Sequence, residues 1–192
     1  MAGKLFLIVG PSGVGKTALL KRLALKHPEF YFPPSATTRP QRENEINGKQ
    51  YFFLTPAEFE QKKSAGEFLE VAVVHKRAKY GTLKKLIAAA LTDNKIILRE
   101  VDIQGLQAIR QKIPAEKIRV VFIIPPNLTI LKKRILRRQN KISATELDNR
   151  LQSTKAELRL INKADFQIVS VENQMATMLK QLEDYIQQET SS

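Results

Sequence analysis

Cysteine and tryptophan are absent from the 192 residues of this sequence, and histidine occurs only twice. Without cysteine the chain has no disulfide framework, no thiolate metal site and no cysteine nucleophile. Hydrophobic residues make up 43% of the chain and charged residues 27%, which is the balance of an ordinary globular protein that folds around its own core. The lack of cysteine is compatible with the reducing cytosol.

Long hydrophobic runs are also missing. The apolar residues 5–9 near the N-terminus are too few for a signal peptide. No other stretch approaches the roughly 18 apolar residues of a membrane-spanning helix. We therefore expect a soluble, cytoplasmic protein that does not associate with membranes.

Acidic residues are scarce relative to basic ones, with 19 Asp and Glu against 32 Lys and Arg and a net charge of +13. Such an excess indicates anionic partners, which include the phosphates of small ligands, nucleic acid or a membrane surface. A basic solvated surface without any specific partner explains the same charge. Composition alone does not choose among these alternatives.

Short β-rich runs alternate with amphipathic helical runs along the chain, and the length fits a single domain with a small inserted lobe. This alternation predicts an α/β fold with a mainly parallel sheet. The predicted strands, compact apolar runs typical of strands covered on both faces, are residues 5–9, 96–100, 120–124 and 167–171. Helical stripes lie between them, and the spacing of Ser143 and Glu146 predicts a capped helix start.

Residues 35–85 differ from this pattern and read as a small lobe inserted into the α/β core. They contain a polar loop, an aromatic strand at 51–53 and an apolar strand at 68–74. Between the strands, Thr55 is placed to cap a short helix, with Pro56 at its first position and Glu58 at its third.

A phosphate-binding loop follows the first predicted strand and opens the first helix, as that motif requires. It consists of Gly10, Pro11, Ser12, Gly13, Val14, Gly15, Lys16 and Thr17. Its glycines allow backbone N–H groups to surround phosphate oxygens at the positive end of the helix. Lys16, at a start of helix that we expect to face solvent, supplies charge for the β- and γ-phosphates, and the Thr17 hydroxyl serves Mg²⁺. The motif predicts an ATP site.

Further motifs stand in a fixed order along the chain. They are the loop GPSGVGK, the run Ser35 to Arg42, the stretch NGKQYFF, the strand GEFLE, the turn Tyr80-Gly81-Thr82, the run Asp102 to Gly105 and the pair Pro125-Pro126 with the basic helix after it. With these motifs the sequence resembles the guanylate kinase family over roughly residues 5–185. The resemblance implies a P-loop nucleoside monophosphate kinase with a parallel-sheet core, an inserted GMP-binding lobe and a basic lid.

The resemblance also implies residue roles in binding the acceptor GMP. Arg39 and Arg42 bind its phosphate, a task that suits the rigid fork of arginine, and Tyr51 and Tyr80 add hydroxyl donors. The implied guanine readers are Ser35, Glu70, Thr82 and Asp102. A carboxylate at position 70 lies among apolar residues and is costly there unless a partner satisfies it. We expect Glu70 to carry the choice of guanine over adenine.

The resemblance implies a lid whose arginines, at positions Arg134, Arg138 and Arg150, fold over the ATP phosphates. The implied catalytic residues are these three arginines together with Lys16 and Arg39. Glu100 stands where the family usually has aspartate, and is placed to hold Mg²⁺ through water. Two further departures are Ser170-Val171 in place of an Asn-Asp pair and residues 75–79 before Tyr80. Both histidines sit at element ends and neither reads as catalytic.

The sequence therefore predicts one guanylate kinase-like domain, with core segments 1–33, 85–126 and 151–192, a GMP-binding lobe at 34–84 and a lid at 127–150. The expected substrates are ATP and GMP with Mg²⁺, and the expected state is a monomer or homodimer. Three alternatives remain: an inactive binding module of the same fold, a related kinase with another phosphorylated acceptor, and nucleic-acid binding driven by charge. No nucleic-acid reader motif is recognisable, so we expect no such partner.

Overall fold

The computed structural model describes residues 2–74, 78–138 and 143–191 of the chain. At its centre lies a parallel sheet whose strands run in the spatial order β6 (Ile96–Glu100), β1 (Lys4–Val9), β7 (Ile118–Ile124) and β8 (Phe166–Val169). The four predicted core strands are all present. The last one ends at Val169, so Ser170 and Val171 follow the strand and do not belong to it.

Helices cover both faces of this sheet, which explains why its strands are mostly apolar. Phe6 and Ile8 pack in one core cluster with residues of α1 (Lys16–Lys26), α5 (Leu128–Arg138) and α7 (Met175–Thr190). Leu5, Leu7 and Val9 point the other way, to α3 (Lys84–Thr92) and α4 (Ile103–Arg110). Alternate residues of β1 therefore serve opposite layers. The predicted α/β class is confirmed.

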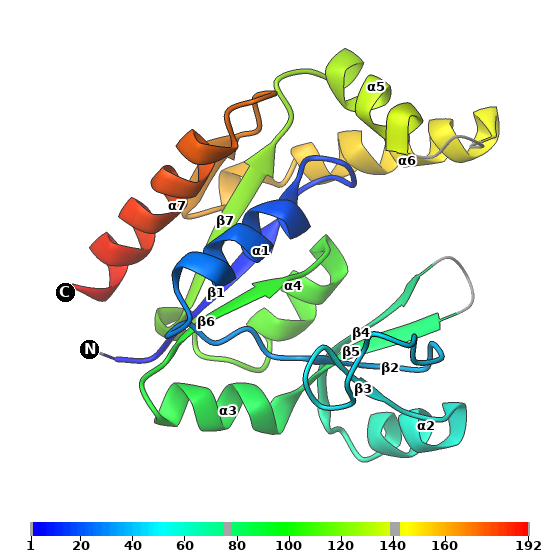
Figure 1. Cartoon of the computed structure of the whole chain (residues 1–192), viewed down its shortest axis with the longest axis vertical. Coiled ribbons are helices and arrows are strands. Elements are labelled where there is room, and N and C mark those ends of the chain that lie inside the picture. Colours follow the sequence, from blue (N-terminus) through cyan, green and yellow to red (C-terminus); the bar gives the residue numbers. More distant parts are fainter. Residues whose placement is uncertain (1, 75–77, 139–142, 192) are drawn as a thin grey trace.

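A second, mixed sheet forms beside the core, with the strand order β3 (Tyr51–Phe53), β2 (Ser35–Thr37), β5 (Ala78–Leu83) and β4 (Phe68–Val74). Helix α2 (Pro56–Ser64) packs against it, and Phe59, Phe68 and Leu83 belong to a separate small cluster. The cap predicted at Thr55 is formed, and Glu58 completes it as a capping box with hydrogen bonds in both directions. This part of the chain projects from the core on the side of α3 and α4 (Figure 1).

Helices α5 and α6 (Ala144–Leu158) lie together at the opposite end of the molecule from the second sheet (Figure 1). Ser143 caps α6 by accepting a hydrogen bond of 3.1 Å from the backbone N–H of Glu146. Helix α6 continues to Leu158, so the expected lid limit at residue 150 falls inside a helix. Two short 3₁₀ helices complete the fold, at Ala115–Lys117 and Ile161–Lys163.

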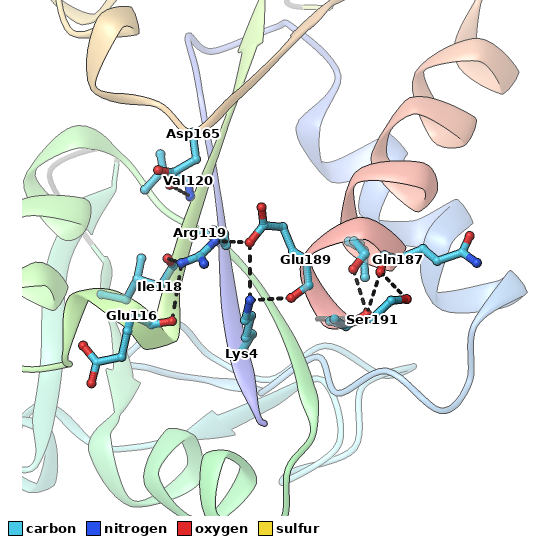
Figure 2. A network of polar contacts seen from close by, with 11 residues as sticks. Lys4, Glu116, Ile118, Arg119, Val120, Asp165, Gln187, Glu189 and Ser191 are labelled. Carbon is cyan, nitrogen blue, oxygen red and sulfur yellow. Dashed lines mark hydrogen bonds and ion pairs between the residues drawn. The ribbon is translucent and has the colours of Figure 1, made fainter. Parts of the chain in front are cut away.

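A polar cluster ties the C-terminal helix to the start of the sheet. The Glu189 carboxylate lies between Lys4 of β1 and Arg119 of β7, and pairs with both (Figure 2). Near the same end, the Asp165 carboxylate accepts a hydrogen bond of 2.7 Å from the backbone N–H of Val120. Because this cluster lies at the amino ends of β1 and β7, it is remote from the carboxyl ends where the P-loop begins.

Candidate active site

The P-loop connects β1 to α1, and its shape depends on three glycines with positive φ. These are Gly10 (138°), Gly13 (90°) and Gly15 (96°). A Cβ atom at Gly10 would also lie 2.3 Å from the carbonyl oxygen of Ile123, so only glycine fits there. Gly15 caps α1 without any side chain, which leaves the first N–H groups of the helix for an anion.

Lys16 begins α1, but its side chain is only 11% exposed, so the expectation of a solvent-facing position is wrong. Its ammonium group folds back and donates to the carbonyl oxygens of Gly10 (2.5 Å) and Pro11 (3.1 Å). Burial lowers the pKa of Lys16, and the surrounding carboxylates, with Glu100 first, oppose that effect. The charge thus sits inside the loop, where phosphate oxygens would replace the carbonyls.

Thr17 and Glu100 form a pair at the carboxyl end of β6. The Thr17 hydroxyl donates to Glu100 Oε2 at 2.8 Å, and Glu100 Oε1 lies 3.8 Å from the Lys16 ammonium. Among the described residues, no three His, Cys, Asp or Glu side chains are grouped so as to hold a metal by themselves. A hydroxyl and a carboxylate oxygen beside the phosphate loop suit Mg²⁺, which keeps several waters and binds through one or two protein oxygens plus phosphates.

One cleft of about 1010 Å³ joins the P-loop to the second sheet. Its lining includes thirteen of the predicted site residues, namely Gly10, Ser12, Gly13, Gly15, Lys16, Thr17, Ser35, Tyr51, Glu70, Tyr80, Glu100, Asp102 and Arg134. The predicted residues Pro11, Val14, Arg39, Arg42, Thr82 and Arg150 do not line it. Val14 packs in the core, and Arg42 has an exposed side chain. The two predicted subsites therefore open into the same space.

The predicted phosphate end of the second sheet is aromatic and cationic. The rings of Tyr51 and Tyr80 lie 6.0 Å apart, and the Arg39 guanidinium lies 5.2 Å from the centre of the Tyr51 ring. Arg39 makes a bidentate pair with Glu45, and this hydrogen-bonded pair raises the pKa of Arg39. Residues 75–77, part of the departure noted before Tyr80, lie outside the described residues.

Glu70 is the buried carboxylate of the predicted base end, with 8% of the residue exposed. Its Oε1 accepts a hydrogen bond of 2.6 Å from the Thr82 hydroxyl on the neighbouring strand. A β-bulge between Phe68 and Glu70 shifts the pairing of β4 with β5 and sets Glu70 opposite Thr82. Asp102 caps α4, accepting from the backbone N–H of Gly105 at 2.7 Å, and also lines the cleft.

Arg99 on β6 was not predicted as a site residue, although the sequence contained a pattern that could have identified it. It is a charge inside an apolar strand, as Glu70 is, and the same argument about the cost of burial applies to it. Its side chain is 13% exposed and lines the cleft, with Nη2 3.6 Å from Glu70 Oε1. Burial lowers the pKa of Arg99, and Glu70 is the main opposing influence.

Glu157 on α6 was also missed, and no local pattern in the sequence singled it out. It lines the same cleft from the side of α6. Burial raises the pKa of Glu157, an effect that the nearby Lys16 charge opposes.

The predicted lid arginines lie on α5 and α6 but are engaged with neighbours. Arg134 donates to the hydroxyl (2.8 Å) and carbonyl (3.0 Å) oxygens of Ser170. Arg150 pairs with Glu146 one turn earlier at 2.7 Å and borders a smaller cavity of about 180 Å³ beside Ser12. The side chain of Arg138 lies outside the described ones. Of the two described arginines, Arg134 alone lines the main cleft.

A P-loop at the carboxyl edge of a parallel sheet, facing an inserted sheet across one cleft, defines a P-loop kinase fold of the nucleoside monophosphate kinase class. The family model for guanylate kinase matches residues 2–189. This chain belongs to the guanylate kinase family. Among the described residues, no helix is long and apolar enough to cross a membrane.

Individual relatives agree with this assignment. The chain is 37% identical to a guanylate kinase of Nostoc sp. over 88% of its own length and 83% of the relative's. It is 39% identical to a guanylate kinase of Bifidobacterium longum over 88% and 87% of the two chains. The crystal structure of guanylate kinase from Anaplasma phagocytophilum superposes with a TM-score of 0.73 at 24% identity, covering 100% of this chain and 88% of that one. At that identity the structural match supports the fold.

Proposed function

We propose that this protein is a guanylate kinase that transfers the γ-phosphate of ATP to the phosphate of GMP, giving GDP and ADP. The observation that carries the proposal is the shared cleft, which joins a P-loop at one end to the buried Glu70–Thr82 pair at the other. A carboxylate in that position accepts from the N1–H and 2-amino groups of guanine. The family relationship points to the same reaction.

The chemistry asks for positioning and charge neutralisation more than for a general base, because the acceptor phosphate is already an anion. Lys16 and the N–H groups of the P-loop hold the donor phosphates. Arg39, Arg42, Tyr51 and Tyr80 hold the acceptor phosphate in line with them. Ser35, Thr82 and Asp102 complete the guanine site around Glu70.

The residues present fit a magnesium ion brought with the nucleotide. Thr17 would bind it directly and Glu100 through water, close to the hydrogen bond that now joins the two side chains. When bound, Mg²⁺ neutralises charge that develops on the transferred phosphoryl group.

The proposed division of labour follows the expected boundaries. Residues 34–84 form the GMP-binding lobe and residues 127–150 the lid, while 1–33, 85–126 and 151–192 form the core. Arg134, Arg138 and Arg150 act from the lid once it closes over the phosphates and excludes water. Closure requires Arg134 to leave Ser170, whose two hydrogen bonds hold it beside the end of β8.

The alternatives are disfavoured by specific residues. An inactive binding module needs no intact P-loop, whereas the P-loop of this chain keeps both Lys16 and Thr17. A kinase for a different acceptor base has no use for the buried Glu70 carboxylate, because the adjacent donors N1–H and the 2-amino group belong to guanine.

The test is a coupled assay of ADP release with ATP, Mg²⁺ and each of GMP, dGMP, AMP, UMP and CMP, with ATP alone as the control for hydrolysis. We expect kcat/KM for GMP to exceed that for AMP by about 10⁴-fold or more, because buried polar matches reject the analogue that lacks them. An AMP value within tenfold of GMP overturns the guanine assignment. Salt-sensitive retention on a duplex DNA column would instead support nucleic-acid binding.

A further inference from the structure

Arg99 brings a guanidinium into the base end of the cleft that the reaction described above leaves unused. The residue lies on β6, directly before Glu100, and its side chain lines the cleft with 13% exposure. Nη1 donates to the carbonyl oxygen of Pro33 at 3.3 Å, which ties β6 to the segment leading into β2. This arginine thus belongs to the core sheet but faces the second sheet.

The hydrogen-bonding capacity of Arg99 is not exhausted by the protein. Within the described chain, its Nε is buried and has no hydrogen-bond partner. Its Nη2 lies 3.6 Å from Glu70 Oε1, an ion-pair distance longer than a normal hydrogen bond. That oxygen already accepts a short bond from Thr82. A buried guanidinium with donors to spare is unfavourable unless a ligand completes it.

We propose that Arg99 is a specificity-determining residue that donates hydrogen bonds to the O6 edge of the guanine base. The proposal rests on the proposed function and deepens it. Guanine presents one acceptor, O6, beside two donors, N1–H and the 2-amino group. Glu70 offers acceptors and Arg99 offers donors side by side, so together they match the whole edge.

The chemistry of purines gives this pair a clear preference. Arginine recognises guanine through O6 and N7, which are both acceptors on one edge. Adenine carries an amino group at position 6, whose hydrogens would face the N–H groups of Arg99. Glu70 distinguishes the two bases at N1 and position 2, whereas Arg99 adds discrimination at position 6. Such a contact is worth about 10- to 100-fold in selectivity.

A different role for Arg99 predicts a different result. If Arg99 only held Glu70 in place, its loss would disturb every contact that Glu70 makes, including the contact to the 2-amino group. The two roles therefore separate when the 2-amino group and the O6 side of the base are changed in different analogues. IMP keeps O6 and N1–H but lacks the 2-amino group. The 5′-monophosphate of 2-aminoadenosine keeps the 2-amino group, replaces O6 with an amino group and thereby also loses N1–H.

The experiment measures kcat/KM for GMP, IMP and 2-aminoadenosine monophosphate in the wild type, Arg99→Met and Glu70→Gln. In Arg99→Met we expect the preference for GMP over 2-aminoadenosine monophosphate to narrow at least tenfold. The preference for GMP over IMP should stay within threefold of the wild-type value. In Glu70→Gln the preference for GMP over IMP should narrow, because Glu70 reads the 2-amino group that IMP lacks. Most of the loss in Arg99→Met should fall on the KM for GMP.

Arg119→Met is the matched control, because this arginine lies on β7 of the same sheet and pairs with Glu189 in the cluster at the amino ends of the strands, away from the cleft (Figure 2). It should leave both preferences unchanged. Should Arg99→Met fail to fold, judged by circular dichroism and by binding of ADP, Arg99→Gln replaces it with the same expected direction.

Two outcomes overturn the proposal. If the preferences for GMP over IMP and over 2-aminoadenosine monophosphate both narrow in Arg99→Met, Arg99 only supports Glu70. If the preference for GMP over 2-aminoadenosine monophosphate is unchanged, Arg99 takes no part in base recognition. Failure of the proposed function gives a separate signal, since the wild type would then not phosphorylate GMP at all.

Discussion

Arg39 and Glu45 face each other in the loop after β2, joined by hydrogen bonds of 2.9 and 2.7 Å between guanidinium and carboxylate. A further bond of 2.7 Å runs from Nη1 of Arg39 to the carbonyl oxygen of Pro40. These three bonds use both N–H groups of Nη1 and one of Nη2. Glu45 therefore fixes the orientation of the other edge of the guanidinium, formed by Nε–H and the second N–H of Nη2. Two parallel N–H groups of this kind can bind a phosphate through two hydrogen bonds.

Glu45→Ala should therefore raise the KM for GMP about fivefold, with a smaller change in kcat. Without its partner, Arg39 must be ordered when GMP binds, at a cost of about 1 kcal/mol. The measurement is steady-state kinetics with varied GMP. Glu67→Ala removes another ion pair of the same lobe, with Lys62, and should leave the KM unchanged. A lower KM in Glu45→Ala would show that Glu45 competes with the acceptor phosphate.

Lys16→Ala should reduce kcat by about 10²- to 10³-fold, the usual loss when one preorganised donor to a developing charge is removed. The fold should persist, because the hydrogen bonds and the ion pair that the ammonium group makes with described residues go to the P-loop carbonyls and Glu100. Lys26→Ala, at the other end of α1, is the control and should keep wild-type kcat. If Lys16→Ala retains more than a tenth of the wild-type kcat, the P-loop lysine has been assigned wrongly.

Arg134→Ala and Arg150→Ala should each lower kcat at least tenfold while changing the KM for GMP less than threefold. The reason is that lid arginines meet the phosphates only on closure, so their loss affects the transition state more than GMP binding. Arg138→Ala should behave alike. Lys133→Ala is the control, because Lys133 is an exposed cation on α5, and it should leave kcat and the KM for GMP unchanged. Wild-type kinetics in all three arginine variants would show that the arginines of α5 and α6 are ordinary solvated charges.

His27 should make stability depend on pH at the end of α1. Its Nδ1 lies 2.7 Å from Glu29 Oε1 and its Nε2 lies 3.0 Å from Glu183 Oε1. Burial by itself lowers the pKa of His27, but the hydrogen bonds to these two carboxylates outweigh it and raise the pKa above 6.5. A raised pKa in the folded state gives stabilisation that is complete below 6.5 and disappears as pH rises through the folded value.

The loss of unfolding free energy in His27→Ala should accordingly be larger at pH 5.5 than at pH 8.5, as measured by urea denaturation. Glu29 and Glu183 remain ionised at the lower pH, because their hydrogen bonds to His27 and Lys26 depress both pKa values despite the desolvation of each carboxyl. Titratable groups that do not contact His27 cancel in the comparison of the two proteins. An equal loss at both pH values would contradict the assigned pairing.

The sequence alone determined the features that depend on local backbone geometry. Gly10, Gly13 and Gly15 adopt φ values that favour glycine, and the loop they build can be read from their spacing. The capping box at Thr55 and Glu58 closes over three residues and was predictable for the same reason. The alternation of short apolar runs with amphipathic helical runs predicted the α/β class. A strand that is buried on both faces is apolar along most of its length, and this can be recognised in the local sequence.

Only the tertiary structure decided which charges meet across the cleft. Glu70 and Arg99 are 29 positions apart and lie on different sheets, and their approach depends on the bulge in β4 and on the packing of α4 against that strand. Glu157 reaches the vicinity of Lys16 only because α6 crosses toward the P-loop. Periodicity records which face of an element is buried, but not which side chain of a distant element it meets, because that is set by register and packing angle.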